Sequence, residues 1–165
     1  MTRALTEIYA SPMGAILLAA DDEGLTSLDF LETTPAAEAV GTNSALRAAV
    51  RWLDVYFSGR APGFTPPLCL RGTPFREEVW RLLLDIPYGE TTTYGALAKT
   101  ISARRGGAPM SAQAVGGAVG RNPVALIVPC HRVIGTDGSL TGYAGGLDRK
   151  ARLLSLEGIK ITGKK

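Results

Sequence analysis

A chain of 165 residues is long enough to bury a real core, as one compact domain or as two small ones. Its composition, 45% hydrophobic and 20% charged, is typical of a globular protein, and no apolar stretch reaches the length of a membrane-spanning helix or a secretory signal. The net charge of +3 is divided unevenly: residues 1–68 carry four Lys/Arg against eight Asp/Glu, whereas residues 69–165 carry fourteen against seven, which favours a polyanionic partner such as nucleic acid for the second part.

The first third of the chain predicts a small antiparallel sheet followed by a helix. Strands are expected at residues 8–9, 16–20 and 25–30. The turn-forming run Asp21–Gly24 separates the last two of them. Asn43 can cap a helix over residues 44–57, which carries one apolar stripe and can end at Gly59. We therefore expect an N-terminal α/β domain over residues 1–68.

The second part of the chain predicts a series of short helices. Residues 60–72 contain three prolines and are typical of a linker. Thr73, followed by a proline, is a good N-cap for one helix, and Thr93 can cap the next, with a loop over residues 102–110 after it. The chain is thus expected to be an α/β (α+β) protein whose mainly helical C-terminal domain covers residues 73–160.

A third short helix, expected over residues 112–120 with Ser111 as its N-cap, has an unusual composition. It contains three glycines, and each interior glycine costs about 1 kcal/mol of helix stability relative to alanine. Two explanations remain open: the helix packs tightly against a neighbour, or a large ligand such as a DNA groove approaches its backbone. Two short helices joined by a loop, with Arg121 after the second, are typical of a helix-turn-helix.

The run Pro129-Cys130-His131-Arg132 is the most informative feature of the sequence. The apolar residues 124–128 before it predict a buried strand that the proline stops. Cysteine is a soft nucleophile, and His131, the only histidine of the chain, is a good proton acceptor. The alternative is that Cys130 is inert core. Because neighbours on a strand point to opposite faces, His131 can reach Cys130 only if the chain turns after Pro129 or a water bridges them.

Two features nearer the C-terminus could complete such a site. The glycine-rich loop around Tyr143 can wrap closely around a planar ligand, or it is a plain surface turn. A last helix is expected over residues 148–157, with Gly158 as its C-terminal cap. Glu157 then lies in the last turn, where the helix dipole disfavours a carboxylate. An exposed glutamate would accept this small cost, whereas one that accepts the N–H of His131 has a reason to be there.

Neither cysteine is expected in a disulfide or a metal site. With no export signal, Cys69 and Cys130 are expected to be reduced thiols in a cytoplasmic protein. Two cysteines and one histidine do not supply the spacing of a closed zinc site, so we expect no metal and no other cofactor.

Together these segments resemble the DNA alkyltransferases that remove alkyl groups from the O6 of guanine, the methylated-DNA–protein-cysteine methyltransferases. The resemblance is carried by Pro129-Cys130-His131-Arg132-Val133, Arg121-Asn122-Pro123, Ala114-Val115-Gly116-Gly117, Tyr88-Gly89-Glu90 with Tyr94, and Gly142-Tyr143-Ala144-Gly145-Gly146. They stand in the family's order from about Thr73 to Gly158. The first 70 residues match loosely and fit the family's N-terminal α/β domain.

The resemblance implies DNA repair by direct reversal. Cys130 would attack the alkyl carbon of O6-alkylguanine, or alternatively of O4-alkylthymine, and keep the group as a thioether in a single turnover. His131 would take the thiol proton through a water, Glu157 would orient His131, and Asn122 would brace the turn before the site. The implied substrate-binding residues are Tyr94, Val133, Tyr143 and Ala144, and the implied DNA-binding residues are Gln113, Ala114, Gly116, Gly117 and Arg121. The implied partner is double-stranded DNA with the lesion flipped out, bound by a monomer.

Two positions depart from the family's pattern. Many members carry an arginine where this chain has Gln113, and Arg104, Arg105 or Arg121 could supply the missing cation. Some members carry a serine where Ala144 stands, so one hydroxyl donor near the O6 atom is lacking here. Both departures concern rate and substrate range more than the reaction itself.

Two other functions remain as alternatives. A cysteine hydrolase built from Cys130, His131 and Glu157 would need an oxyanion hole and would turn over repeatedly. A non-catalytic protein that flags DNA damage would lack the motif cysteine, which this chain has. A single burst of one alkyl group per protein separates the alkyltransferase from both.

Overall fold

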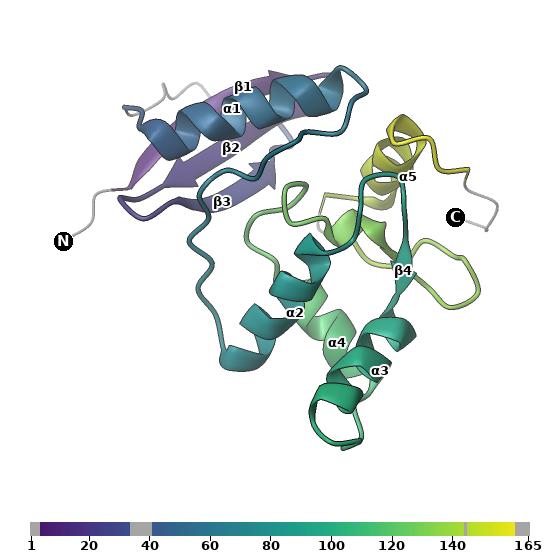
Figure 1. Ribbon diagram of the computed structural model, residues 1–165. Coiled ribbons are helices and arrows are strands. Elements are labelled where there is room, and N and C mark those ends of the chain that lie inside the picture. Colours follow the sequence, from purple (N-terminus) through teal and green to yellow (C-terminus); the bar gives the residue numbers. More distant parts are fainter. Residues whose placement is uncertain (1–3, 34–40, 144, 161–165) are drawn as a thin grey trace. The chain divides into compact units, whose positions relative to one another are not determined.

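The computed structural model describes residues 4–33, 41–143 and 145–160 (Figure 1). Its elements are, in chain order, β1 (Leu5–Ser11), β2 (Gly14–Ala20), β3 (Leu25–Phe30), α1 (Ser44–Phe57), α2 (Pro74–Leu84), β4 (Thr92–Thr93), α3 (Tyr94–Arg104), α4 (Ala112–Val119), the 3₁₀ turn η1 (Cys130–Arg132), β5 (Val133–Ile134) and α5 (Leu147–Leu156). The chain forms two compact units. The first comprises the chain up to Arg71 together with Pro123–Ile127, and the second comprises Gly72–Asn122 and the chain from Val128 onward.

The first unit contains the three-stranded antiparallel sheet that the sequence predicted, in the order β1-β2-β3. Helix α1 lies along one face of this sheet and contacts all three strands (Figure 1). Asn43 caps α1 as expected, because its side-chain oxygen accepts a hydrogen bond of 2.9 Å from the backbone N–H of Leu46. The N-terminal part therefore has the α/β architecture inferred from its sequence.

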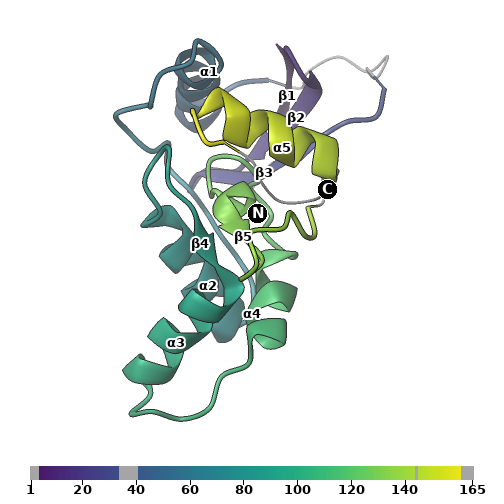
Figure 2. The same cartoon turned by 90° about the vertical axis from the view of Figure 1, so that its right-hand side faces the viewer.

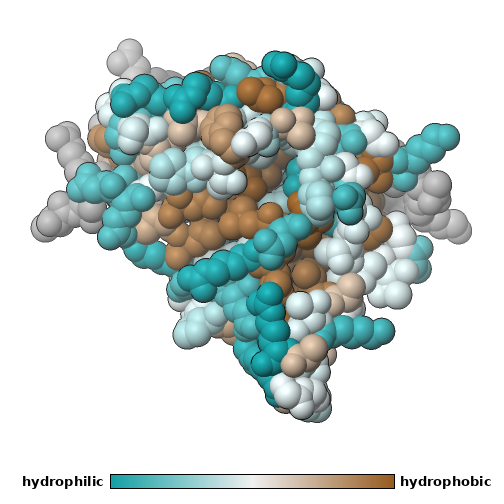
Figure 3. Space-filling view, viewed as in Figure 1, coloured by the Kyte–Doolittle hydropathy of each residue, from teal (hydrophilic) through white to brown (hydrophobic). Residues whose placement is uncertain are grey.

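Helix α1 is amphipathic, which is why its sequence pattern was readable. Leu46 and Leu53 are fully buried, whereas Arg47, Arg51 and Asp54 are exposed. The space-filling view shows a largely hydrophilic surface over this helix (Figure 3). The outer face of α1 is thus an ordinary solvated surface.

The predicted linker at residues 60–72 contributes one backbone bridge to the sheet. The N–H of Leu25 donates to the carbonyl of Pro67 (2.7 Å), and the N–H of Cys69 donates back to the carbonyl of Leu25 (2.9 Å). Gly24 permits this approach, since a Cβ there would lie 2.8 Å from the backbone of Pro67 and Leu68. Residues 67–69 are therefore fixed to the edge of the sheet.

The prediction of a strand over residues 124–128 is wrong. Val124 makes one isolated parallel bridge with Leu28, and Leu126 then turns the chain with a φ of 76°, a left-handed conformation that is rare for a non-glycine residue. The apolar run does report burial, because Val124 and Leu126 are fully buried. Over so few residues, however, hydrophobicity cannot distinguish a strand from a buried turn.

The second unit is mainly helical, as predicted. The side chains of Thr73, Thr93 and Ser111 accept hydrogen bonds from backbone N–H groups in the first turns of α2, α3 and α4, respectively. Helix α4 packs against α2 and α3, and the indole N–H of Trp80 in α2 donates to the carbonyl of Ala118 (2.8 Å). Helices α3 and α4 lie side by side with their connecting loop at one end, the helix-turn-helix expected from the sequence (Figure 2).

The last helix and a short strand pair frame the remaining part of the second unit. Helix α5 begins and ends one residue earlier than predicted, between Gly146 (φ 96°) and Gly158 (φ 85°). Strands β4 and β5 pair in parallel, with Thr92 opposite Val133, a contact that the sequence did not predict. None of the helices in the described ranges has the length and apolar character needed to span a bilayer.

Candidate active site

Cys130 lies at the first position of the 3₁₀ turn η1, and 8% of it is exposed. The turn is closed by the N–H of Val133, which donates to the carbonyl of Cys130, and by the N–H of Arg132, which donates to the carbonyl of Pro129 (3.0 Å). The chain therefore turns after Pro129, so that Cys130 and His131 are not held on opposite faces of a strand. This geometry satisfies the condition that the sequence set for a Cys–His site.

Asn122 fixes the segment that leads into this turn. Its side-chain amide donates to the carbonyl of Val128 at 2.8 Å and so joins the two ends of the Pro123–Ile127 segment. The position of this amide supports the bracing role that the resemblance implied for Asn122.

His131 and Glu157 form a buried pair. The Nε2 atom of His131 lies 2.6 Å from Oε2 of Glu157, and neither side chain has any exposed surface. This hydrogen bond confirms the interaction predicted from the position of Glu157 at the end of α5. The carboxylate also accepts hydrogen bonds from the guanidinium of Arg132 and from the N–H of Gly89 (3.0 Å). These donors compensate an anion placed where the helix dipole alone would disfavour it.

The environment of His131 favours the neutral form of its imidazole. Burial has the largest effect and lowers the pKa of His131, the Glu157 carboxylate raises it, and the charges of Arg132 and Lys150 lower it again. Since Nε2 faces a carboxylate, the hydrogen-bond geometry assigns the proton to Nε2 and the lone pair to Nδ1. A neutral imidazole in this tautomer can act as a proton acceptor for a thiol.

Lys150 is a functional candidate that the sequence analysis missed. Its side chain in α5 is fully buried, and Nζ donates to the carbonyls of Val133 (2.7 Å), Thr141 (2.8 Å) and Gly142 (3.4 Å). Burial lowers the pKa of Lys150 to about 8, while the charge of a Cys130 thiolate raises it. The ammonium thus ties β5 to the glycine-rich loop and places a positive charge near the thiol.

Two tyrosines stand around the cysteine. The hydroxyl of Tyr94 donates to the carbonyl of Thr141 (3.1 Å), whereas the buried hydroxyl of Tyr143 has no hydrogen-bond partner in the described part of the chain. Burial raises the pKa of both phenols, and the charge of a Cys130 thiolate raises it further, so both rings lie near the thiol. The predicted neighbour Ala144 lies outside the described residues.

Helix α4 and the residues just after it carry the positions predicted to bind DNA. Gln113, Ala114, Gly117 and Arg121 are exposed. Gly116 faces α3, where an added Cβ would lie 3.6 Å from the ring of Tyr94, whereas an added Cβ on Gly117 would meet only open space. A Cβ on Gly116 would make only ordinary contact with Tyr94, and Gly117 leaves the outer face of the helix bare, so both explanations for the glycines stay open.

The arginines named as substitutes for a cation at Gln113 differ in their surroundings. The guanidinium of Arg105 pairs with Glu78 of α2 (2.9 Å) and lies 5.6 Å from the centre of the Phe75 ring. Arg104 and Arg121 are exposed. Arg105 is thus engaged within the second unit, and the other two are better placed to reach a polyanion.

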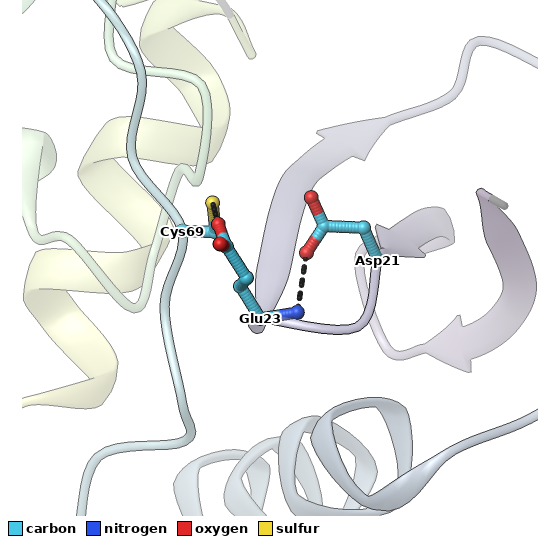
Figure 4. Close-up of side chains that lie close together, drawn as sticks. All are labelled: Asp21, Glu23 and Cys69. Carbon is cyan, nitrogen blue, oxygen red and sulfur yellow. Dashed lines mark hydrogen bonds between the residues drawn. The ribbon is translucent and has the colours of Figure 1, made fainter. Parts of the chain in front are cut away.

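A second polar cluster lies in the first unit, around Cys69 (Figure 4). Ligand-type atoms of Asp21, Glu23 and Cys69 lie within 4.8 Å of one another. The Arg71 guanidinium donates to both carboxylates (2.8 and 3.1 Å), and the Cys69 thiol donates to Glu23 (3.3 Å). Burial has the largest effect and raises the pKa of Cys69, and the hydrogen bond to Glu23 raises it further. Arg71 already pairs with both carboxylates, and the absence of a metal stays our prediction.

The fold and site define a two-part protein with a helix-turn-helix and a buried cysteine beside a His–Glu pair. The family model described as the 6-O-methylguanine DNA methyltransferase DNA binding domain matches residues 74–159, and the ribonuclease-like domain of the same methyltransferase matches residues 5–70. The chain belongs to the 6-O-methylguanine DNA methyltransferase family.

Individual relatives agree with this assignment. The chain is 49% identical over 155 residues to the methylated-DNA–protein-cysteine methyltransferase of Methanosarcina acetivorans, covering 92% of this chain and 96% of that protein. It is 49% identical over 150 residues to the protein of that name from Mycobacterium leprae, covering 89% of this chain and 88% of that protein. It is also similar to the crystal structure of Mycobacterium tuberculosis OGT in complex with DNA, with 48% identity, a TM-score of 0.79, and 92% and 91% of the two chains covered.

Proposed function

We propose that this protein repairs alkylated double-stranded DNA by direct reversal, transferring an alkyl group from the O6 of guanine to its own Cys130. The observation that carries this proposal is the buried Cys130 thiol on η1, next to the His131–Glu157 pair. Membership of the methyltransferase family supports it, as does the similarity to a relative crystallised with DNA.

The proposed reaction is a single displacement. The sulfur of Cys130 forms a bond to the alkyl carbon as the bond from that carbon to O6 breaks, and the electron pair of that bond returns to the base. The thiol proton passes to His131 through a water, and uptake of a proton by the purine ring restores guanine. Cys130 keeps the alkyl group as a thioether, so each protein molecule acts once.

The base would be held by groups that surround the cysteine. Tyr94 and Tyr143 supply aromatic walls, and the buried Tyr143 hydroxyl is available to a polar group of the ligand. The Val133 carbonyl, which now accepts from Lys150, is the acceptor we assign to the guanine amine. Ala144, which follows Tyr143 in the sequence, is the fourth residue that we assign to binding of the base. The target base must leave the duplex to reach them, at a cost of a few kcal/mol.

DNA would be bound by α4. Its exposed residues Ala114 and Gly117 present little bulk, so the helix can approach the floor of a groove, with Gln113 exposed beside them and Arg121 just after the helix. Gly116 of the same helix faces the ring of Tyr94. We assign DNA binding and transfer to residues 73–160, and a separate domain to residues 1–68. We further propose that the protein acts as a monomer in the cytoplasm, where thiols stay reduced.

A burst experiment tests this function. Protein is mixed with an excess of duplex DNA containing O6-methylguanine, and the restored guanine is counted after enzymatic digestion of the DNA. We expect one guanine per protein molecule and then no further product. Continued turnover would favour a cysteine hydrolase, and no product with retained DNA binding would favour a protein that only flags damage.

A further inference from the structure

The carboxylate of Glu157 is shared between two side chains of the η1 turn. One oxygen, Oε2, accepts from His131 Nε2 (2.6 Å) and from Arg132 Nη2 (3.2 Å). The other, Oε1, accepts from Arg132 Nε (2.9 Å) and from the N–H of Gly89 (3.0 Å). His131 is therefore not the sole partner of the anion that orients it.

The guanidinium of Arg132 is held in place from other directions as well. Its Nη1 donates to the carbonyl of Ile86 (2.8 Å), just after α2, and its Cζ lies 5.7 Å from the centre of the Tyr88 ring. Only 6% of the residue is exposed. A buried, rigidly held and permanently charged group thus stands beside the carboxylate.

We propose that Arg132 is a positioning residue that balances the charge of Glu157, so that His131 remains a neutral imidazole that can accept the Cys130 proton. The proposal rests on the proposed function for its purpose. Arg132 and Glu157 form a buried pair of opposite charges. Glu157 therefore orients the His131 ring by a hydrogen bond, while Arg132 offsets the negative charge that the ring would otherwise experience. His131 Nε2 keeps its proton and donates it in a hydrogen bond to Glu157, and the thiol proton goes to Nδ1 of His131.

The other charged and titratable groups facing His131 act in known directions. These are Glu157, the C-cap residue of α5, Lys150 within α5, and Arg132 of η1. Burial is the largest factor and lowers the pKa of His131, Glu157 raises it, and Arg132 and Lys150 lower it. With Arg132 uncharged, the unbalanced carboxylate would favour the imidazolium, which has no lone pair for a proton.

Titration of His131 by nuclear magnetic resonance tests this balance directly, because the chain has one histidine and its ring signals need no assignment among several. In the unmodified protein we expect a neutral ring at pH 7, protonated at Nε2, with a pKa below the usual value of about 6.5. In Arg132→Gln we expect the pKa of His131 to rise by about one to three pH units. In Arg132→Lys, which keeps the charge but loses the fork, we expect a value near that of the unmodified protein.

The pH dependence of transfer gives a second reading. Transfer by Arg132→Gln, relative to the plateau rate of that variant, should fall about tenfold for each pH unit below the raised pKa of His131. The unmodified protein should keep its plateau rate in the same pH range. The control is Arg81→Gln, which removes another ion-paired arginine of the second unit, one that pairs with Glu77 of α2 and has a side chain 73% exposed. It should change neither the titration nor the profile.

Two results would overturn the proposal. If Arg132→Lys and Arg132→Gln titrate alike, Arg132 acts only as a structural link. If His131 of the unmodified protein is an imidazolium at pH 7, the balance does not exist, and this measurement requires no variant to fold. Failure of the proposed function would look different: DNA containing O6-methylguanine would be left unrepaired, whatever His131 does.

Discussion

His131 couples the chemistry of the site to the stability of the fold. Because folding lowers its pKa, the folded state binds fewer protons than the unfolded chain between the lowered value and about pH 6.5. Stability rises with pH wherever the unfolded state binds more protons. We therefore expect the free energy of unfolding to fall as the pH drops below about 6.5. Urea denaturation between pH 7.5 and 5 measures this free energy. In His131→Asn the part of the pH dependence that His131 causes should be absent. Identical pH slopes in the two proteins would contradict it.

Lys150 gives a second prediction for a single residue. Lys150→Met removes the donor to Val133 and Thr141 and the positive charge near Cys130. We expect transfer to slow about tenfold or more, and the pH at which a small reagent alkylates Cys130 half-maximally to rise. Lys99→Met, at an exposed lysine of α3, is the matched control and should do neither. If Lys150→Met has the same transfer rate and the same pH profile of alkylation as Lys99→Met, Lys150 does not assist the reaction of Cys130.

The residues of the site were predictable in part. The Pro129–Arg132 run and the position of Glu157 at a helix end were sufficient to predict the His131–Glu157 hydrogen bond. Lys150 was missed because charged residues are usually exposed. A signal existed in the sequence: Lys150, Leu153, Leu154 and Glu157 follow the i, i+3, i+4, i+7 spacing of a buried stripe. Arg132 was named only as part of the Pro129–Arg132 run and received no role, because sequence alone does not show which carboxylate a buried arginine meets.

Among the elements, α4 is the one whose role mutations can isolate. An added side chain on Gly117 meets open space, so Gly117→Leu should leave the packing of α4 intact and place bulk on its bare face. We expect DNA affinity, measured by fluorescence anisotropy, to fall about tenfold, which corresponds to about 1.4 kcal/mol. Gly117→Ala is the control, because it raises helix propensity by about 1 kcal/mol with little bulk. Unaltered affinity in the leucine variant would show that α4 does not face DNA.

The helices were more predictable than the other elements. Asn43, Thr73, Thr93 and Ser111 mark helix starts by a local hydrogen bond that the sequence shows directly. The strand expected over residues 124–128 failed because burial there comes from a turn and a single bridge to β3. The β4–β5 pairing joins residues about forty positions apart, and such contacts leave no local pattern.

For the whole molecule, the uneven charge predicts how DNA binding responds to salt. Residues 69–165 carry the excess of Lys and Arg, and each phosphate that they neutralise releases counterions. We expect the logarithm of the affinity for duplex DNA to fall linearly with the logarithm of salt concentration. Reaction of Cys130 with a small uncharged alkylating reagent should show no such dependence and is the control. Affinity that does not depend on salt would show that the protein binds DNA without contacts to its phosphates.

Transfer to Cys130 itself can be measured by intact-protein mass spectrometry after incubation with duplex DNA containing O6-methylguanine, followed by peptide mapping. We predict one added methyl per protein, located on Cys130 and absent from Cys69, whose thiol is held protonated by burial and by its hydrogen bond to Glu23. Cys130→Ser should bind the same DNA and gain no mass. A methyl on Cys69, or repaired DNA with an unmodified protein, would contradict direct transfer to Cys130.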